Sequence, residues 1–433
     1  MYTTAKSSFS LADAPLAGEP PEWPARAGSR PARRLAAAAI GLCAAAGLVL
    51  LSSPAMAAPA SSLAGASART RAAAATQPAD HFLAVSCPAR RMCVAVGIAD
   101  ITRQLLLAER WNGRNWTVIH PVLPAGATSG GLTGVSCSSP RACTAVGFDF
   151  IPGIGSGPLA ERWNGRSWAL QSVPSAGNEG IPLAGVSCPA AESCTAVGEA
   201  NYDPATGAVS PLAEHWNGSR WIIQSTPQIG NPGSALSGVS CSSSSVCTAV
   251  GDYEGQDDEG PGAAPLALRW SAAKWAVQPT PGAASATDNE DSELAGVSCT
   301  AASACIAVGY DINGEPLALR WNGTRWASQQ ITGPLPLSAV SCWSASRCIA
   351  VGDPDFSGFA ESLHGHAWTL QHVRTPAGAH SIFLTGVSCP AAGRCTAVGY
   401  QAGTVSQVTD IRTLAERWNG HTWLIQATPS PLK

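Results

Sequence analysis

Seven copies of one phrase fill most of this chain, and that repetition constrains the fold more than any other feature. Each copy reads roughly L-x-G-V-S-C-x5-C-x-A-V-G, followed after a variable stretch by P-L-A-x-R-W-N-G-x-x-W-x-x-Q. The leading cysteines fall 50, 51, 53, 58, 43 and 47 residues apart. An in-phase unit of about fifty residues is typical of an array of small, similar modules that bury their apolar faces against one another.

The second copy shows which elements the pattern predicts. Its predicted strands are Leu132–Cys137, Cys143–Phe148, Leu159–Trp163 and Trp168–Val173. The Gly- and Pro-containing stretch 149–157 predicts a loop, and Asn164-Gly165 predicts a tight I′ hairpin turn, which needs positive φ at both central residues. Four short antiparallel strands per unit, repeated seven times, predict an all-β, seven-bladed β-propeller.

The cysteines form an even set at constant spacing. Cys43 stands alone in an N-terminal apolar run, and the remaining fourteen fall into seven C-x5-C pairs. Cysteines six positions apart around a five-residue loop face each other across a hairpin, which favours one disulfide per blade. Zinc is the alternative, but this spacing matches no common zinc site and no histidine accompanies each pair. The predicted pairs are Cys87/Cys93, Cys137/Cys143, Cys188/Cys194, Cys241/Cys247, Cys299/Cys305, Cys342/Cys348 and Cys389/Cys395.

The tryptophans of the repeat predict where the blades are thick. Two tryptophans flank the turn between the third and fourth strands in six copies, and the sixth copy has Leu363 at the first position. Their strict repetition favours a packing role, with sugar stacking as the alternative. No segment before Phe82 resembles the fourth strand, so we expect blade seven to close the ring by packing on blade one, without an exchanged strand.

The N-terminus is typical of an export signal. Arg30, Arg33 and Arg34 precede an apolar run over 35–51, and Ala55-Met56-Ala57 fits a cleavage site. We predict a signal peptide over 1–57, a disordered Ala/Ser-rich linker over 58–80 and the propeller over 81–433, at the cell surface or outside the cell. The repeats would start near residues 82, 132, 183, 236, 294, 337 and 384. An uncleaved membrane anchor is the alternative, and general secretion and twin-arginine export both remain open.

The repeat resembles the Asp-box (sialidase-type or BNR) propeller repeat and its relatives among photosystem-assembly-type propellers, and looks like repeats common in exported actinobacterial proteins. In the second copy the resemblance rests on Leu132, Val135, the Ala145-Val146-Gly147 strand and the Gly165-x-x-Trp168 turn. Trp163 stands at the Asp-box aspartate position and Glu161 at the serine position. The resemblance implies a propeller fold. It does not imply sialidase activity, because the arginine triad and the tyrosine–glutamate pair of that chemistry have no counterpart here.

Acidic residues cluster in two variable stretches, which should emerge side by side on the face opposite the cysteine hairpins. The candidate binding residues are Asp257, Asp258, Glu259, Asp288, Asp291 and Glu293. Clustered carboxylates are what calcium prefers, and a cationic partner would suit them too. Solvated loops with no ligand are the alternative, since neither stretch has an EF-hand or RTX spacing. His364-Gly365-His366 replaces one Asn-Gly turn, and we interpret it as an irregular turn rather than a metal site.

Composition and motifs narrow the function. The formal net charge is −3, which argues against a nucleic-acid partner. No nucleophile elbow, zinc-protease motif or phosphate loop is present, so no catalytic residue is assigned. The leading hypothesis is an exported, non-enzymatic propeller that binds a protein or a glycan and needs no cofactor, apart from the calcium that the acidic loops could bind. A hydrolase or lyase with its site at the mouth of the axial channel is the rival, and a structural spacer is the third hypothesis.

Overall fold

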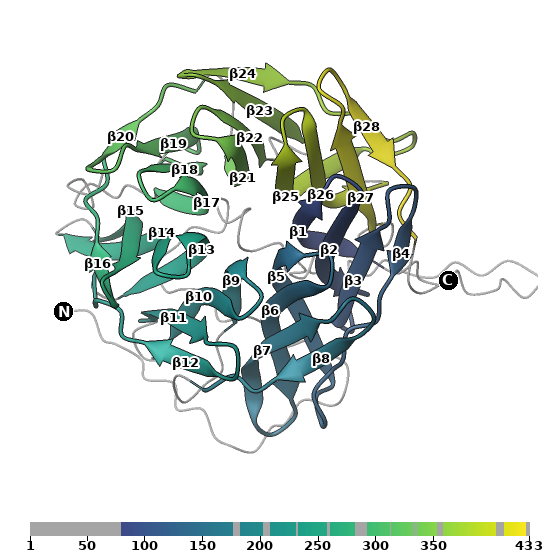
Figure 1. The fold of residues 1–433 in the computed structure, drawn as a ribbon, viewed down its shortest axis with the longest axis horizontal. Coiled ribbons are helices and arrows are strands. Elements are labelled where there is room, and N and C mark those ends of the chain that lie inside the picture. Colours follow the sequence, from purple (N-terminus) through teal and green to yellow (C-terminus); the bar gives the residue numbers. More distant parts are fainter. Residues whose placement is uncertain are drawn as a thin grey trace, which may run out of the picture.

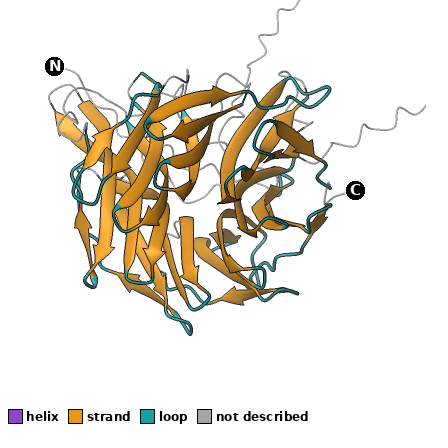
Figure 2. Ribbon diagram, turned by 45° about the horizontal axis from the view of Figure 1, so that its top comes forward, coloured by secondary structure: helices purple, strands orange, loops and turns teal. Residues whose placement is uncertain are grey.

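Seven four-stranded antiparallel sheets surround one axis like the blades of a propeller (Figure 1). The computed structural model describes residues 79–175, 182–201, 208–230, 233–257, 260–281, 292–311, 313–331, 333, 336–352, 358–403 and 411–429, with only the backbone of 255–257 and 260–262. Strands and loops make up all of this described part, without a helix (Figure 2). The all-β, seven-bladed prediction is confirmed.

The strands of each blade run outward from the axis in sequence order. The innermost strands are β1 (His81–Ala89), β5 (Ser129–Ser139), β9 (Leu183–Ala190), β13 (Ser234–Ser243), β17 (Glu293–Ala301), β21 (Leu337–Ser344) and β25 (Ser381–Ala391). The second strands are β2 (Met92–Ala99), β6 (Ala142–Ile151), β10 (Ser193–Ala200), β14 (Val246–Asp257), β18 (Ala304–Tyr310), β22 (Arg347–Gly352) and β26 (Arg394–Ala402). The third strands are β3 (Leu105–Trp111), β7 (Gly155–Trp163), β11 (Ser210–Trp216), β15 (Gly260–Ser271), β19 (Pro316–Trp321), β23 (Phe359–His364) and β27 (Ile411–Trp418). The outermost strands are β4 (Trp116–Val118), β8 (Trp168–Gln171), β12 (Trp221–Gln224), β16 (Lys274–Val277), β20 (Trp326–Ser328), β24 (Ala367–Gln371) and β28 (Trp423–Gln426).

The hydrophobic core lies between blades rather than inside one. Val94 and Val96 of β2 are fully buried against Leu132 and Trp163 of the next blade, and the same arrangement recurs around the ring. The second strands carry Ala, Val and Cys because a sheet covered on both faces near the axis has room for small apolar side chains only. The two tryptophan positions fill the wider gaps farther out, where each pair of rings packs at a tilt, with centroids 5.5–5.9 Å apart.

The ring closes without an exchanged strand, as predicted. Blade one contains only β1–β4 and blade seven only β25–β28, and these two blades lie side by side in Figure 1. Phe82 packs with Val398 and Ala415 of blade seven in one buried cluster. The backbone N–H of Asp80 also donates to the carbonyl of Ile411 at 3.2 Å. The closing seam therefore uses the same kind of packing as the other seams.

Each of the seven predicted disulfides is present, one per blade. They join Cys87 to Cys93, Cys137 to Cys143, Cys188 to Cys194, Cys241 to Cys247, Cys299 to Cys305, Cys342 to Cys348 and Cys389 to Cys395. The paired cysteines lie opposite each other across the innermost hairpin, with Cα atoms 3.9–4.1 Å apart. This number of disulfides suggests an oxidising, extracellular environment.

The predicted signal peptide is not part of the described structure. Residues 1–78 lie outside the described part of the chain. Within the described part, no helix is long and apolar enough to span a membrane.

The second blade differs from the prediction in three places. The stretch 149–157 is mostly strand, because β6 and β7 stay in register from Asp149 opposite Gly157 to Ile151 opposite Gly155. The outermost strand ends at Gln171, two residues early. The Asn164-Gly165 turn is not a two-residue I′ turn, because four residues connect β7 and β8. Gly165 has positive φ, and Asn164 does not. The Asn164 Oδ1 atom accepts hydrogen bonds from two following amides, which stabilises the wider turn.

The acidic stretch of blade four is also less loop-like than predicted. β14 and β15 form a hairpin that pairs from Cys247 opposite Trp270 out to Asp257 opposite Gly260. Asp252, the first acidic residue of this stretch, lies within β14 and is buried. The glycine and proline residues of this stretch predicted a loop, because β-propensity does not show that two segments extend a hairpin that has already formed.

A glycine in the second strand is required where the innermost strand bulges. The register of every innermost hairpin shifts by one residue just after the repeat's first apolar residue. This bulge pushes a carbonyl against the A-V-G glycine of the second strand. A Cβ atom on Gly147 would lie 1.9 Å from the carbonyl oxygen of Gly131.

We therefore predict that Gly147→Ala lowers the free energy of unfolding by about 2–3 kcal/mol or prevents folding, because the clash is with backbone. The control is Gly134→Ala in the same blade, where a Cβ atom would lie 3.2 Å from its nearest neighbour and where two other blades already carry Ala84 and Ala339. Urea unfolding of both variants measures the difference. Equal stabilities would contradict the bulge explanation.

Candidate functional site

The two ends of each sheet form two different faces of the ring. The hairpin between the first two strands and the turn between the last two lie at one end, where they touch: a Cβ atom on Gly165 would lie 2.8 Å from Cγ of Arg141. The connections from second to third strand, and from blade to blade, leave from the other end. We call the first the hairpin face and the second the connection face.

The paired cysteines belong to the scaffold and not to a surface that could bind a ligand. The structure places the second cysteine of every pair in the buried core, out of reach of a ligand. These seven buried residues are Cys93, Cys143, Cys194, Cys247, Cys305, Cys348 and Cys395. Each is the second residue of a second strand, which neighbouring blades cover on both faces, and this position explains their burial.

Four of these buried sulfur atoms also contact the preceding blade. The Thr144 hydroxyl lies 3.5 Å from Sγ of Cys194, and because a disulfide sulfur has no hydrogen, the hydroxyl is the donor. Equivalent threonines of the second strands contact Cys93, Cys247 and Cys305 at 3.5–3.7 Å. The disulfides therefore take part in the packing between blades as well as closing the hairpins.

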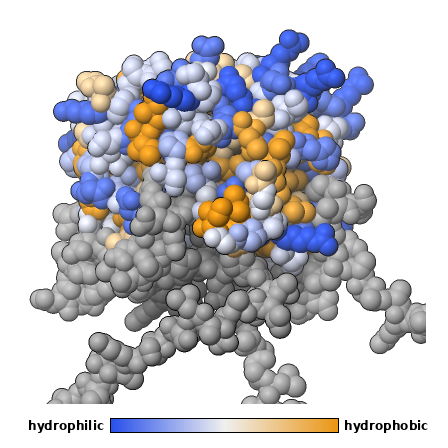
Figure 3. Space-filling view, turned by 90° about the horizontal axis from the view of Figure 1, so that it is seen from below, coloured by the Kyte–Doolittle hydropathy of each residue, from blue (hydrophilic) through white to orange (hydrophobic). Residues whose placement is uncertain are grey.

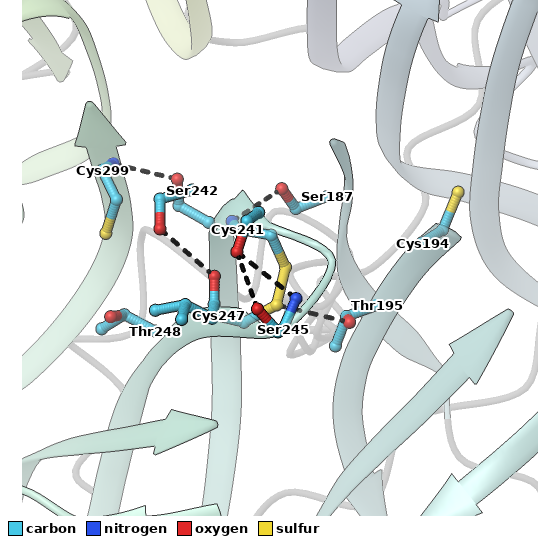
Figure 4. Close-up of a disulfide and its surroundings, with 12 residues drawn as sticks. Ser187, Cys194, Thr195, Cys241, Ser242, Ser245, Cys247, Thr248 and Cys299 are labelled. Atoms are coloured by element: carbon cyan, nitrogen blue, oxygen red, sulfur yellow. Dashed lines mark hydrogen bonds between the residues drawn. A yellow bond between two sulfur atoms is a disulfide. The ribbon is translucent and has the colours of Figure 1, made fainter. Parts of the chain in front are cut away.

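The serine before each leading cysteine forms a bond between blades. The Ser187 Oγ atom accepts a hydrogen bond from the backbone N–H of Cys241 in the next blade at 2.9 Å (Figure 4). The same bond recurs at all seven seams, including the closing one, at 2.9–3.0 Å. Seven repeated serines thus form a belt around the axis, which accounts for their repetition by structure and not by nucleophilic chemistry.

We predict that Ser136→Ala lowers the free energy of unfolding by about 1–3 kcal/mol, because the buried N–H of Cys188 loses its acceptor. Thermal unfolding measures this, with Ser167→Ala in an exposed turn as the control. Covalent labelling of the wild-type protein by a fluorophosphonate that Ser136→Ala abolishes would contradict the structural assignment.

The outermost strands carry a second set of bonds between blades. The Trp275 Nε1 atom donates to Oε1 of Gln224 in the preceding blade at 3.0 Å, and three other seams repeat this bond at 3.1–3.3 Å. Blade one has Ile119 in place of the glutamine, and the indole N–H of Trp168 that faces it has no hydrogen-bond partner among the described residues. The W-x-x-Q motif therefore joins blades at four seams, and the second tryptophan position is buried in every blade, with or without this bond.

The innermost strands carry small or apolar side chains over most of their length. From the first apolar residue to the cysteine they carry only Leu, Phe, Thr, Ala, Ser, Gly, Val and Cys, and all seven segments are described. Thr385 donates its hydroxyl to the carbonyl of Phe82 across the closing seam at 2.9 Å. These side chains serve packing and hydrogen bonding between strands.

A layer of buried glutamates is the main feature that the sequence analysis missed. The third strand places a fully buried glutamate two residues before the first tryptophan position in five blades. The other two blades have a fully buried leucine there. The five glutamates are Glu109, Glu161, Glu214, Glu361 and Glu416, and the two leucines are Leu268 and Leu319. The sequence pattern that could have revealed this layer is the variable position in P-L-A-x-R-W, which is either glutamate or leucine in every copy.

The connection from the preceding blade donates a hydrogen bond to two of the glutamates. The backbone N–H of Val122 donates to Glu161 Oε2 at 3.0 Å, and the N–H of Arg374 donates to Glu416 Oε2 at 3.1 Å. Both donors lie six residues after the outermost tryptophan of the preceding blade.

Proline replaces that donor ahead of two other glutamates. Pro174 precedes Glu214 and Pro429 precedes Glu109 at the same position, and proline has no N–H. Neither carboxyl oxygen of Glu214 or Glu109 has a hydrogen-bond partner among the described residues.

The pKa values follow this difference in four of the five glutamates; in the fifth, Glu361, whose carboxyl oxygens have no hydrogen-bond partner among the described residues, burial raises the pKa to about 7. Burial raises the pKa of Glu161 and of Glu416 to about 7, against the opposing effect of the donated N–H. Burial raises the pKa of Glu214 to about 8, and burial together with the charge of Asp80 raises that of Glu109 to about 9. Glu109 and Glu214 are therefore protonated at neutral pH, which is the more favourable state for an unpaired buried carboxyl group.

We predict that Glu109→Leu stabilises the protein increasingly as the pH rises. The carboxyl group ionises near its ordinary pKa in the unfolded chain but only near 9 in the fold, so the wild type loses stability through that interval. The melting temperature of the variant should exceed that of the wild type by about 2 °C or more at about pH 8, and the gap should shrink towards about pH 5.

Glu161→Leu is the matched control, because Val122 already stabilises its carboxylate. Its gain should be smaller and should level off at a lower pH, since its pKa is about 7. A pH-independent difference for Glu109→Leu would show that Glu109 is not buried as a neutral acid.

Most of the predicted acidic site lies outside the described residues. This applies to Asp258, Glu259, Asp288 and Asp291, and to the side chain of Asp257. Glu293 is described: it begins β17 and accepts a hydrogen bond from the Tyr310 hydroxyl at 3.0 Å. That contact ties two strands of one blade together. The described residues contain no group of three or more His, Cys, Asp or Glu side chains arranged to hold a metal ion.

The histidine turn of blade six also has a structural explanation. The Arg347 guanidinium lies within hydrogen-bond distance of Nδ1 of His364, and the N–H of Gly365 donates to the carbonyl of Ser346 at 2.9 Å. Gly365 adopts positive φ. The turn thus packs against the cysteine hairpin of its own blade.

Comparison with known proteins finds no family and no close relative. No family model matches the chain, and no curated protein matches it. Among solved structures, a structure described as YCF48 bound to D1 peptide is 13% identical over 72% of this chain and 84% of that one, with a TM-score of 0.44. The WD40 repeats of RRP9 are 11% identical over 73% and 86%, with a TM-score of 0.47. A fucose-specific lectin from Aleuria aurantia is 14% identical over 69% and 96%, with a TM-score of 0.42. At this level of identity and TM-score, nothing about a ligand carries over to this chain.

Proposed function

We propose that this protein is an exported, non-enzymatic propeller that binds a protein or glycan partner through its connection face. The observation that carries the proposal is that the repeated residues hold the blades together, whereas the residues that vary lie in the connections. The repeated serine, cysteine, tryptophan and glutamine residues hold blade to blade, as the seven serine–cysteine bonds show most clearly. Residues that do not repeat are free to differ without cost to the ring.

The non-repeating residues concentrate in the connections. Connections from second to third strand range from residues 258–259 in blade four to 201–209 in blade three, and one blade-to-blade connection spans 278–292. The hairpin face, by contrast, keeps one loop length in all seven blades. Variable loops on a rigid scaffold are where binding surfaces usually evolve.

Binding and turnover must be measured together to test this. The disulfide-bonded protein is applied to a glycan array and to immobilised cell-surface proteins, and the bound ligand is then examined for chemical change. Shortening the 201–209 connection should weaken binding without changing the melting temperature, whereas replacing the 217–220 turn on the hairpin face should not weaken it. A ligand that is cleaved, or binding of a protein or an uncharged glycan that survives every change to the connections, would contradict the proposal.

The acidic residues of the connection face, including Asp257 and Asp258, are proposed as part of this surface. Calcium is the metal that such a carboxylate group would take. Titration with calcium should raise the melting temperature if the residues converge on an ion. An unchanged melting temperature would reject the calcium site, and these carboxylates would then serve to attract a cationic partner.

A further inference from the structure

The two faces of the ring differ sharply in charge, although the formal net charge is only −3. The basic face is defined here by three sets of positions: the loops between paired cysteines, the turns between the two tryptophan positions, and the residue before the first of these positions. All of these positions are described. They hold fifteen of the 26 Arg and Lys residues and one acid, Glu192. The basic residues are Arg90, Arg91, Arg110, Arg114, Arg141, Arg162, Arg166, Arg220, Arg269, Lys274, Arg320, Arg325, Arg347, Arg394 and Arg417.

These cations form no ion pairs within the part of the chain that the structure describes. Nine of the fifteen are exposed. In the edge-on view of Figure 3, hydrophilic side chains are frequent along the upper edge of the ring, and apolar patches lie below them on the outer side of the ring. A surface with this much unneutralised charge of one sign attracts anions from solution.

Several of the guanidinium groups are held in place. Arg269 donates to the carbonyl of Ala302 in the next blade at 2.7 Å and lies over the ring of Trp321, 5.6 Å from its centroid. Arg320 donates to the carbonyls of Ala345 and Gly365 in blade six. These contacts fix the two positive charges at the seams between blades four, five and six.

The charge is densest across the closing seam and blade two. Nine of the fifteen residues belong to blades seven, one and two. Burial, and then the charges of Arg394 and Arg91, lower the pKa of Arg417, so these three cations from two blades crowd one another. Such crowding of like charges is unfavourable in the free protein and is relieved when an anion binds between them.

We propose that the basic face binds a linear anionic polysaccharide that carries carboxylate or sulfate groups along its length. Fourteen of the fifteen cations are arginine, whose planar fork matches such groups. The cations follow the ring from blade to blade, which suits a long polymer better than a single small anion. This surface lies opposite the connection face, so the proposal goes beyond the proposed function and does not depend on it.

Two other polyanions fit the surface less well. Single-stranded nucleic acid needs aromatic rings on which bases stack, but the tryptophans that flank the turns are buried or half-buried. An anionic membrane surface favours apolar side chains that insert between lipids. The large exposed apolar residues lie elsewhere, on the outermost strands and in connections, as Ile223, Val277 and Ile154 illustrate.

The test compares two triple variants of equal charge. Arg90→Ser/Arg91→Ser/Arg141→Ser removes exposed cations from the dense sector, and Arg220→Ser/Lys274→Ser/Arg325→Ser removes as many from blades three to five. Their binding to polygalacturonate and to dextran sulfate is measured at an ionic strength of about 0.15 M, with neutral dextran as the blank. The wild type should bind both anionic polymers and not dextran. The first variant should bind about tenfold or more weakly, and the second should lose distinctly less.

Four results would overturn the proposal. They are a wild type that binds neither anionic polymer, an equal loss in both variants, tighter arginine-dependent binding to a short DNA duplex or to phosphatidylglycerol vesicles, and arginine-dependent self-association at low salt. Unchanged melting temperatures of both variants exclude unfolding as the cause of any loss. Ligand binding through the connection face is measured separately, so either proposal can fail alone.

Discussion

The seam between neighbouring blades is the interaction on which the rest of the molecule depends. At each seam a serine hydroxyl accepts the amide N–H of the next blade's cysteine, and the disulfide fixes the hairpin that presents this amide. Because a ring closes only when every seam turns the chain by a similar angle, one geometry is repeated seven times. The small residues of the innermost strands, the A-V-G glycine and the bulge beside it all follow from the close approach of backbones at the axis.

The buried glutamates show that this scaffold tolerates a local cost. Leu268 and Leu319 stand at the same position in two blades, so the fold itself does not need a carboxyl group there. The backbone donor is present for Glu161 and Glu416, whereas both leucines follow connections that have proline at the donor position. Glu109 and Glu214 also follow proline, so a buried acid is accommodated in these two blades without the donor.

Much of this architecture was readable from the sequence. The blade number, the cysteine pairs and the closure without an exchanged strand follow from a repeat that is local and in phase. The long hairpins around Asp149 and Asp252 were missed because Gly and Pro obscure a ladder that only pairing can reveal. The glutamate layer was missed because glutamate is read as a surface residue until its neighbours are known. The basic face was hidden by a net charge of −3, since a sum of charges carries no information about which end of a sheet each charge occupies.

Titration of free thiols in the denatured, unreduced protein tests the account most directly. A ring with one disulfide in every blade leaves Cys43 as the one reactive thiol of the full-length chain, and leaves none once a signal peptide over 1–57 is removed. Fourteen further thiols that react at once would contradict the stapled hairpins, and with them the shared geometry of the seams.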